Sequence, residues 1–380
     1  MPSFPYWRLS SFYFFYFAFV GAFSPYWSLY LKSLKFSAPE IGVLMSLLMV
    51  TRIFAPTLWG WLADHSGKRV SIVRIAAALS LASYFGVFFG ESFWWIFGVM
   101  TLLSFFWSAS LPLVEAITLS HLGDSTARYG RVRLWGSVGF IIAVIGIGYI
   151  LDVAEVRILL WLVLGTMTGI LVFSRYIPEA ETAIHPTDRL PVSQILRRAE
   201  VAALFAACFL MVAAHGPFYT FYSLYLVAQG YSKGAVGLLW AVGVICEIAV
   251  FIGMPRIMQR FSISQILGAS FSLAVIRFLL IGWLVDSVAA ILFAQVLHAA
   301  TFGSYHAAAI AAIHHFFRGR NQAKGQALYT SLTFGAGGTF GALISGYTWD
   351  FLGASLTFSM ASLFALLGLL LIAWKFRLKT

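Results

Sequence analysis

Four ionisable side chains lie deep inside long apolar stretches of this sequence, at Arg52, Glu115, Glu247 and Arg277. Each stretch has the roughly 20 apolar residues that a bilayer crossing needs. A charged group there is costly and usually faces a partner or a water-filled cavity, so these side chains are candidates for binding a solute or carrying a proton. With Arg133, at the start of a further stretch, the deep cations exceed the deep acids by one, which suits a monoanionic substrate.

The positions of these groups suggest different roles. Arg52 lies about 20 Å from the end of its stretch at the rise of an α-helix, too deep for its guanidinium to reach the surface comfortably. Glu115 and Arg133 flank a short loop, so antiparallel helices would bring them together, either in a binding site or as an ion pair that pins two helices. Glu247 stands alone in its stretch and is the predicted proton carrier; the alternative is a hydrogen-bonded neutral acid without a transport role.

Two stretches place histidine and aromatic residues on one helix face. They are His215, Tyr219 and Tyr222 in the first stretch, and His298, Phe302 and Tyr305 in the second. Such faces can stack an aromatic ring and donate hydrogen bonds to it, although packing against lipid or the core explains any single member as well. Pro217 follows His215 closely and predicts a break in the helix that could act as a gate hinge.

The composition indicates that these residues are held by membrane helices. Of the 380 residues, 61% are hydrophobic and 10% are charged, too few charges to cover a soluble surface. Twelve apolar stretches are joined by short polar connections, which predicts an all-α membrane protein with 12 transmembrane helices. The predicted spans are 10–31, 40–63, 71–90, 94–120, 131–151, 157–177, 201–227, 234–254, 264–285, 289–315, 324–348 and 354–374.

The cations are distributed very unequally between the two sides of the predicted spans. If the N-terminus is cytoplasmic, the cations that fall on the opposite side are Lys32, Lys35, Arg157 and Lys233. This bias follows the positive-inside rule, so we expect a multi-pass membrane protein with both termini in the cytoplasm. The net charge of +11 therefore reports topology, and nucleic acid is not an expected partner.

The longest hydrophilic stretch divides the predicted spans six and six. It runs from Pro178 to Glu200 and predicts two six-helix bundles, 1–178 and 201–380, joined by a cytoplasmic linker at 179–200. Two such bundles facing each other across a central cavity are the plan of transporters built from repeats.

The loop between the second and third spans carries a specific motif, Gly60-Trp61-Leu62-Ala63-Asp64-His65-Ser66-Gly67-Lys68-Arg69. Gly60 would allow close helix approach, Gly67 a tight turn, and Asp64 could meet a helix N-terminus or a cation. The motif resembles the signature loop of the major facilitator superfamily. The resemblance implies that Gly60, Asp64, Gly67, Lys68 and Arg69 latch a cytoplasmic gate without touching substrate.

Residues 111–140 resemble the lactose permease of the oligosaccharide–proton symporter family. The resemblance implies that Glu115 and Arg133 line the substrate site, and it extends to Arg277 and His298. The permease's proton-carrying glutamate is replaced here by Thr301. If protons are coupled, another group must carry them, and Glu247, modulated by Arg277 or a histidine, is the first choice.

A resemblance to the phenylpropionate permease family extends over nearly the whole chain. It is carried by Tyr129-Gly130-Arg131-Val132-Arg133-Leu134-Trp135-Gly136, Ala214-His215, Gly230-Tyr231-Ser232, Ala235-Val236-Gly237 and Leu297-His298. This family shares Arg52, which we therefore assign to a substrate carboxylate; the alternative is an internal pair with Glu115. The resemblance implies proton-coupled symport of a small aromatic carboxylate such as 3-phenylpropionate across the inner membrane of a bacterial cell into the cytoplasm.

Other functions lack support in the sequence. There is no Walker loop, dinucleotide fingerprint or metal-ligand spacing, so we expect no enzyme activity, no cofactor and no metal. The expected partners are a small-molecule substrate, protons and the lipid bilayer, and the expected state is a monomer. A proton-coupled sugar or nucleoside symporter is the alternative, favoured by the Glu115 and Arg133 match.

Overall fold

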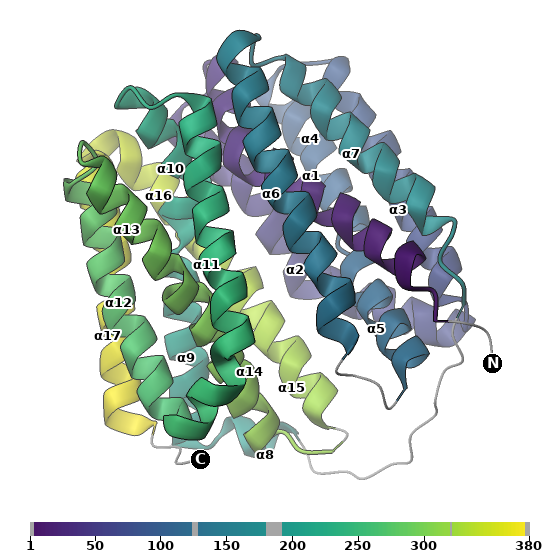
Figure 1. Cartoon of the computed structure of the whole chain (residues 1–380), viewed down its shortest axis with the longest axis vertical. Helices are drawn as coiled ribbons and strands as arrows, with labels where there is room; N and C mark the ends of the chain where they lie inside the picture. Colours follow the sequence, from purple (N-terminus) through teal and green to yellow (C-terminus); the bar gives the residue numbers. More distant parts are fainter. Residues whose placement is uncertain (1–3, 124–127, 180–191, 320, 377–380) are drawn as a thin grey trace. The chain divides into compact units, whose positions relative to one another are not determined.

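The computed structural model describes residues 4–123, 128–179, 192–319 and 321–376, and every regular element in these ranges is helical (Figure 1). The helices of the first half are α1 (Tyr6–Ser33), α2 (Ala38–Ser66), α3 (Arg69–Phe85), η1 (Gly86–Phe88), α4 (Phe93–Trp107), α5 (Ser110–Leu122), α6 (Tyr129–Val153) and α7 (Ile158–Ser174). Those of the second half are α8 (Val192–Leu196), α9 (Ala199–Ala214), α10 (Gly216–Ala228), α11 (Lys233–Arg260), α12 (Ile263–Trp283), α13 (Val288–His298), η3 (Ala299–Ser304), α14 (Tyr305–Phe316), α15 (Asn321–Tyr329), η4 (Thr330–Gly337), α16 (Gly338–Leu352) and α17 (Ala354–Lys375). Each predicted span coincides with one helix or with consecutive helices, so the predicted all-α membrane fold is confirmed.

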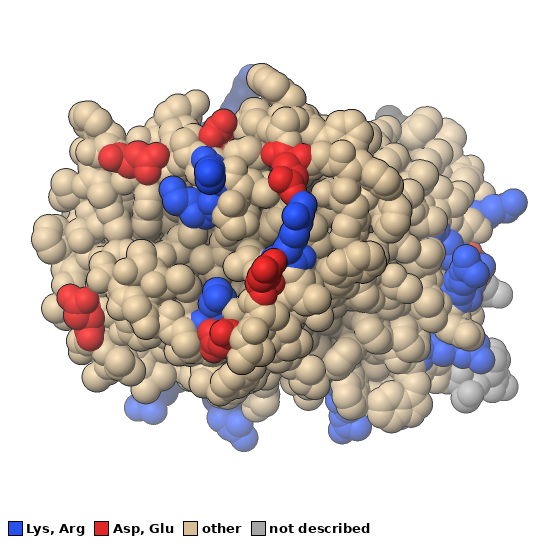
Figure 2. All heavy atoms as spheres, turned by 90° about the horizontal axis from the view of Figure 1, so that it is seen from above, with Lys and Arg blue, Asp and Glu red and all other residues tan. Residues whose placement is uncertain are grey.

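Nine segments of the described chain are long and apolar enough to cross a membrane. The other predicted spans fall short for local reasons: α7 has 17 residues, α1 is rich in buried tyrosine and tryptophan, and α15 to α16 carries many glycines and threonines. Even the end face in Figure 2 is made mostly of uncharged residues. Charge is therefore sparse on this face as well as along the spans.

The seventh predicted span is broken at a residue that the sequence marked as functional. α9 ends at Ala214, α10 begins at Gly216, and His215 lies between them. Pro217 in the first turn of α10 lacks the backbone N–H that would continue the helix. A Cβ on Gly216 would clash with the backbone of Gly341, so glycine lets the broken helix pack closely on α16.

Two further spans contain π-helical turns. η3 begins directly after His298 and η4 directly after Tyr329. Such turns are rare and often occur at functional sites. In η3 the wider turn separates His298 from Tyr305, so these two residues do not continue the regular spacing that the sequence predicted.

The chain forms two compact units, each of which includes a short piece from the other half of the sequence. Unit 1 consists of Met1–Phe36, Phe54–His185 and Ser232–Leu238, and unit 2 of Ser37–Ile53, Pro186–Tyr231 and Leu239–Thr380. In unit 1, α1 packs along α6 and α7; in unit 2, α17 packs against α12 and α9. The predicted bundles 1–178 and 201–380 stay a prediction, and most of the predicted linker 179–200 lies outside the described residues.

In each unit, an acidic side chain caps the start of the helix segment that comes from the other half of the sequence. In unit 1 the Asp152 carboxylate, from the end of α6, accepts hydrogen bonds from the backbone nitrogens of Lys233 (2.7 Å) and Gly234 (3.0 Å). In unit 2 Asp350 Oδ2 accepts one from the Ala38 nitrogen at 3.1 Å. A carboxylate at a helix N-terminus is stabilised by the helix dipole, which explains why these first turns of α11 and α2 associate with α6 and α16.

Candidate functional site

Arg277 of α12 lies at the centre of a fully buried polar cluster in unit 2, with 0% of its surface exposed. Its Nε donates to the Ala294 carbonyl oxygen at 3.0 Å, and its Nη1 donates to Thr301 Oγ1 at 3.2 Å. The guanidinium carbon lies 4.3 Å from the centroid of the Phe218 ring, a cation–π distance. The side chain is therefore held by three helical elements, α10, α13 and η3.

His215 completes the ring of contacts around Arg277. Its Nδ1 lies 2.8 Å from the Met211 carbonyl oxygen, and its Nε2 lies 3.2 Å from Arg277 Nη1. A carbonyl oxygen can only accept, and a guanidinium can only donate. The geometry thus assigns the proton of His215 to Nδ1 and leaves Nε2 to accept from Arg277, so the imidazole is neutral and acts as a positioning group at the break between α9 and α10.

The positive charge of Arg277 has no acidic partner in the described part of the chain. No described Asp or Glu lies within ion-pair distance of it, and its Nη2 has no hydrogen-bond partner there. Buried charges are normally paired, because removing an ion from water is expensive. The cluster can therefore receive a negative charge.

Glu247 and His298 form a second contact in unit 2. Glu247 Oε2, from α11, lies 3.7 Å from His298 Nε2 at the end of α13, and their side chains are 19% and 7% exposed. The His298 ring stacks with Phe218 and Phe302 at centroid distances of 5.5 and 5.4 Å. His298 Nδ1 has no partner among the described atoms, so one nitrogen faces the acid while the other is open to a further group.

Tyr222 and Gln295 make the shortest contact of this region. Gln295 Nε2 donates to the Tyr222 hydroxyl at 2.6 Å, and both side chains are fully buried. Gln295 Oε1 has no described partner. Gln295 was not predicted from the sequence, although its position one helical turn before His298 places it on the same side of α13 and could have indicated it.

Tyr219 connects these contacts to Arg52. Its ring lies 6.0 Å from that of His215, and Glu247, Arg277 and Arg52 each interact with it electrostatically. Arg52 belongs to the α2 segment of unit 2 and is partly exposed. Unit 2 therefore brings together seven of the predicted residues: Arg52, His215, Tyr219, Tyr222, Glu247, Arg277 and His298.

Glu115 and Arg133 meet separately in unit 1. Arg133 Nε lies 4.0 Å from Glu115 Oε1, at the limit of an ion pair, and the side chains are 30% and 36% exposed. Tyr129 donates to the same oxygen at 3.1 Å, and the Arg133 guanidinium lies 3.7 Å from the centre of the Phe17 ring. A long, partly solvated pair contributes little stability, and its exposure leaves both groups able to contact a solute.

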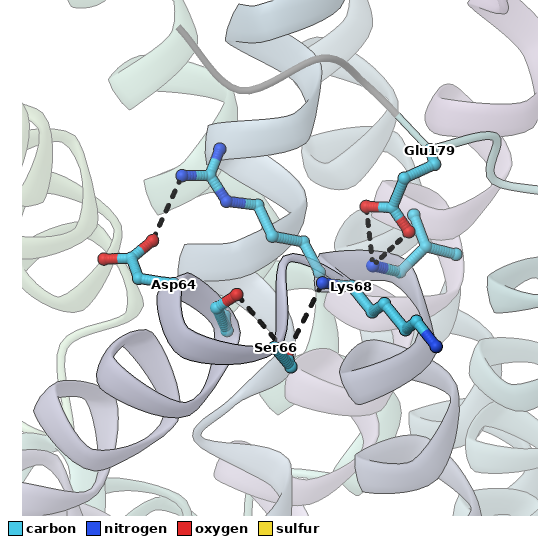
Figure 3. Close-up of polar contacts among 7 residues, drawn as sticks. Asp64, Ser66, Lys68 and Glu179 are labelled. Carbon is cyan, nitrogen blue, oxygen red and sulfur yellow. Dashed lines mark hydrogen bonds and ion pairs between the residues drawn. The ribbon is translucent and has the colours of Figure 1, made fainter. Parts of the chain in front are cut away.

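The predicted gating loop is a tight turn between α2 and α3 (Figure 3). Gly67 has a φ of +63°, a conformation that favours glycine. Asp64 Oδ1 lies 3.3 Å from Arg69 Nη2, and the Lys68 nitrogen donates to Ser66 Oγ at 3.4 Å. The loop thus has the turn and the acid–cation contact that its sequence suggested.

Two details of this loop differ from the prediction. A Cβ on Gly60 would meet no described atom within 4 Å, so the expected close helix approach at Gly60 is wrong for this structure; α2 is simply not crowded there. Glu179 was not predicted either; its carboxylate oxygens both lie 3.2 Å from the Val70 nitrogen and cap the start of α3 (Figure 3). Glu179 lies far from the loop in sequence, so spacing alone could not reveal it.

No group of three or more His, Cys, Asp and Glu in the described ranges could hold a metal ion. The arrangement offers a buried cation, an acid–histidine pair and stacked rings, which are suited to binding a solute and moving a proton.

Comparison with known proteins gives matches over nearly the whole chain. The profile of the MFS_1 like family matches residues 6–360. The chain is 28% identical over 353 residues to the probable 3-phenylpropionic acid transporter of Escherichia coli (strain K12), covering 92% of each protein. It is 28% identical over 374 residues to the maltose permease of Geobacillus stearothermophilus, covering 95% of this chain and 93% of the permease. The crystal structure of the nucleoside transporter NupG matches with a TM-score of 0.85 at 16% identity, covering 98% of this chain and 99% of that one, which is a likeness of fold.

Proposed function

The chain belongs to the MFS_1 like family of the major facilitator superfamily, and from this we propose that it is a proton-coupled symporter of a small aromatic carboxylate. The family membership confirms the predicted major facilitator fold and a membrane transporter rather than an enzyme. In our proposal the substrate resembles 3-phenylpropionate and enters a bacterial cytoplasm across the inner membrane. Both chain ends are on the cytoplasmic side, and the protein works as a monomer.

The buried charge of Arg277, which has no acidic partner among the described residues, carries the proposal. A guanidinium and a carboxylate form paired, charge-assisted hydrogen bonds, and Arg277 Nη2 lacks a described partner. A substrate carboxylate would supply both the missing acceptor and the missing negative charge. A neutral solute would supply no negative charge. Because Arg277 is enclosed here, the carboxylate would reach it in a conformation in which the neighbouring side chains have moved, with Arg52 as the more accessible first contact.

The rings around Arg277 support an aromatic substrate. Phe218 lies against the guanidinium and stacks with His298, which stacks in turn with Phe302. A phenyl ring inserted beside this row gains offset or edge contacts and burial of apolar area. An aliphatic carboxylate would gain the ion pair without these ring contacts.

Glu247 and His298 are the proposed site of proton binding. At 3.7 Å the carboxyl oxygen and the imidazole nitrogen need a movement of less than 1 Å to share a proton by a hydrogen bond. Protonation would neutralise Glu247 while a bound carboxylate neutralises Arg277. The loaded carrier would then hold a neutral Glu247 and a neutralised Arg277 in its interior, and this difference between loaded and empty states favours the change of access.

A sugar or nucleoside symporter is the second candidate. Gln295 Oε1 and His298 Nδ1 have no described partner, and both can pair with a solute hydroxyl. The maltose permease among the relatives and the exposed Glu115–Arg133 pair are consistent with this class.

A proteoliposome screen separates the two candidates. The purified protein is reconstituted, an inward proton gradient is imposed, and the uptake of labelled 3-phenylpropionate, 3-phenylpropanol, maltose and uridine is followed together with internal pH. Uptake of the carboxylate with acidification beyond that of empty liposomes supports the proposal. Gradient-driven uptake of maltose or uridine without the carboxylate would replace it by the second candidate.

A further inference from the structure

An apolar groove in unit 2 is lined by none of the predicted site residues. It has a volume of about 330 Å³ and lies between α11, α12 and η3. Its wall includes Val250 of α11, Phe261 directly after the end of α11, Ala269 of α12, and Ala300 of η3. This volume is in the range of ligand-binding pockets.

The polar atoms in the groove wall bond to one another. Ser270 Oγ lies 3.0 Å from Ser304 Oγ, and Ser304 Oγ donates to the Ala300 carbonyl oxygen at 2.8 Å. At the mouth, Gln265 Oε1 accepts a hydrogen bond from the Ser262 nitrogen at 2.9 Å. Since these groups are satisfied within the wall, the part of an occupant that lies inside gains little from polar groups, and hydrocarbon suits it best.

The flank that carries the groove bears large exposed apolar side chains. On α12, Ile276 and Leu279 are 47% and 41% exposed, and on α11, Ile252 is 70% exposed. Gln265 and Ala269, which line the groove, belong to the same stripe of α12 because they precede Ile276 by 11 and 7 residues. In a membrane-spanning chain such a stripe faces lipid, so the groove is open to acyl chains.

Two cations directly precede residues of the groove wall: Arg256 comes before Ile257 and Arg260 before Phe261. Arg256 and Arg260 lie one turn apart at the end of α11, and both are exposed. The Arg260 guanidinium carbon is 5.9 Å from the ring centroid of Phe261, a residue of the groove wall. Neither arginine forms an ion pair with a described residue, and the N-terminus of α12 beside them adds positive potential.

We propose that this groove binds one anionic phospholipid of the surrounding bilayer, with an acyl chain between α11, α12 and η3 and its phosphate beside Arg256 and Arg260. Hydrocarbon fits the satisfied apolar wall, and the headgroup charge complements the two arginines at the helix end, where lipid phosphates lie. A zwitterionic lipid has a phosphate too, but its own cation opposes the arginines. The site therefore discriminates by net charge.

Occupancy of the groove would reach the Glu247–His298 contact through a single layer of side chains. Val250, in the wall, lies one turn after Glu247, and η3 begins directly after His298. A Cβ on Gly303 would lie 3.2 Å from Glu247 Cγ and 3.6 Å from Val250 Cγ1. The lipid would brace η3 against Glu247, so loss of the lipid should loosen this contact.

The test is lipid titration of the full-length purified protein by native mass spectrometry, which needs no knowledge of the transported solute. Dioleoyl phosphatidylglycerol is compared with dioleoyl phosphatidylcholine for the wild type, Arg256→Gln/Arg260→Gln and Ala269→Trp. The control variants are Arg197→Gln/Arg198→Gln, with the same change in charge at the start of α9, and Ile276→Trp, further along the α12 stripe.

We expect the double Arg256→Gln/Arg260→Gln change to lower the affinity for phosphatidylglycerol by about thirtyfold, since each cation near an anionic headgroup raises the affinity about fivefold. Ala269→Trp should lower the affinity for both lipids, and the control variants should bind both lipids like the wild type. Ala269→Met serves if the larger side chain prevents folding, as judged by helical content. Equal affinity of the wild type for both lipids would overturn the proposal. Unchanged lipid binding by Ala269→Trp, whose side chain fills the groove, would also overturn it. A carrier that moves no aromatic carboxylate but shows this lipid pattern would contradict the proposed function alone.

Discussion

Replacing Arg277 by glutamine removes the buried charge that we propose binds the substrate carboxylate. Cutting one partner from a buried, hydrogen-bonded charge pair costs about 2–5 kcal/mol of binding, which corresponds to between roughly thirtyfold and several-thousandfold in affinity. An alcohol of the same shape makes no ion pair with Arg277 and should lose far less. The expected result is therefore a collapse of the preference for the carboxylate over its alcohol.

The stability of the empty protein should change little in the same variant. Arg277→Gln deprives the Ala294 oxygen, Thr301 Oγ1 and His215 Nε2 of a donor, at about 1 kcal/mol each. It also removes a buried charge without an acidic partner, which costs several kcal/mol to bury. The two effects oppose each other, so the unfolding temperature without substrate should stay near that of the wild type.

The assay is counterflow in proteoliposomes with the best-transported aromatic carboxylate and the matching alcohol. The measured quantity is the ratio of their apparent KM values, because partial misfolding lowers both transport rates and cancels in this ratio. Arg277→Lys is the control that keeps the charge and should restore part of the preference. If Arg277→Gln weakens the carboxylate and the alcohol by the same factor, Arg277 does not bind the carboxylate.

Three further predictions test the other groups. Glu247→Gln should retain exchange of preloaded substrate and lose uphill accumulation in a proton gradient; loss of binding with coupling intact would argue against its role as proton carrier. Arg52→Gln should raise the KM of carboxylates more than that of their amides, because its partly exposed guanidinium is the proposed first contact; equal increases would remove it from the site. Glu179→Gln should lower unfolding stability by about 1 kcal/mol as a weakened helix cap, and Asp64→Asn by less than about 0.5 kcal/mol because its ion pair is exposed. Thermal unfolding of the purified variants gives this order, and the reverse order would show that Asp64 has a further partner.

The sequence by itself determined the helical spans and where several of the charges would meet. Long apolar stretches in a chain with few charges have no stable fold in water, and a bilayer admits them as helices because backbone polar groups must be satisfied internally. The pairing of Glu115 with Arg133 was also predictable, since a short loop joins their helices. Gly67 was recognisable from the turn that the motif requires.

The tertiary structure decided which side chains touch across helices distant in sequence. His215 and Arg277 are 62 residues apart, and helical spacing gives the face of each residue but not the helix that packs against it. The same reason explains why Gln295 and Glu179 were missed and why Gly60 packs against nothing described here. Whether Arg277 has an acidic partner depends on how α10, α12, α13 and η3 pack together, and that packing leaves a buried charge that a substrate can neutralise.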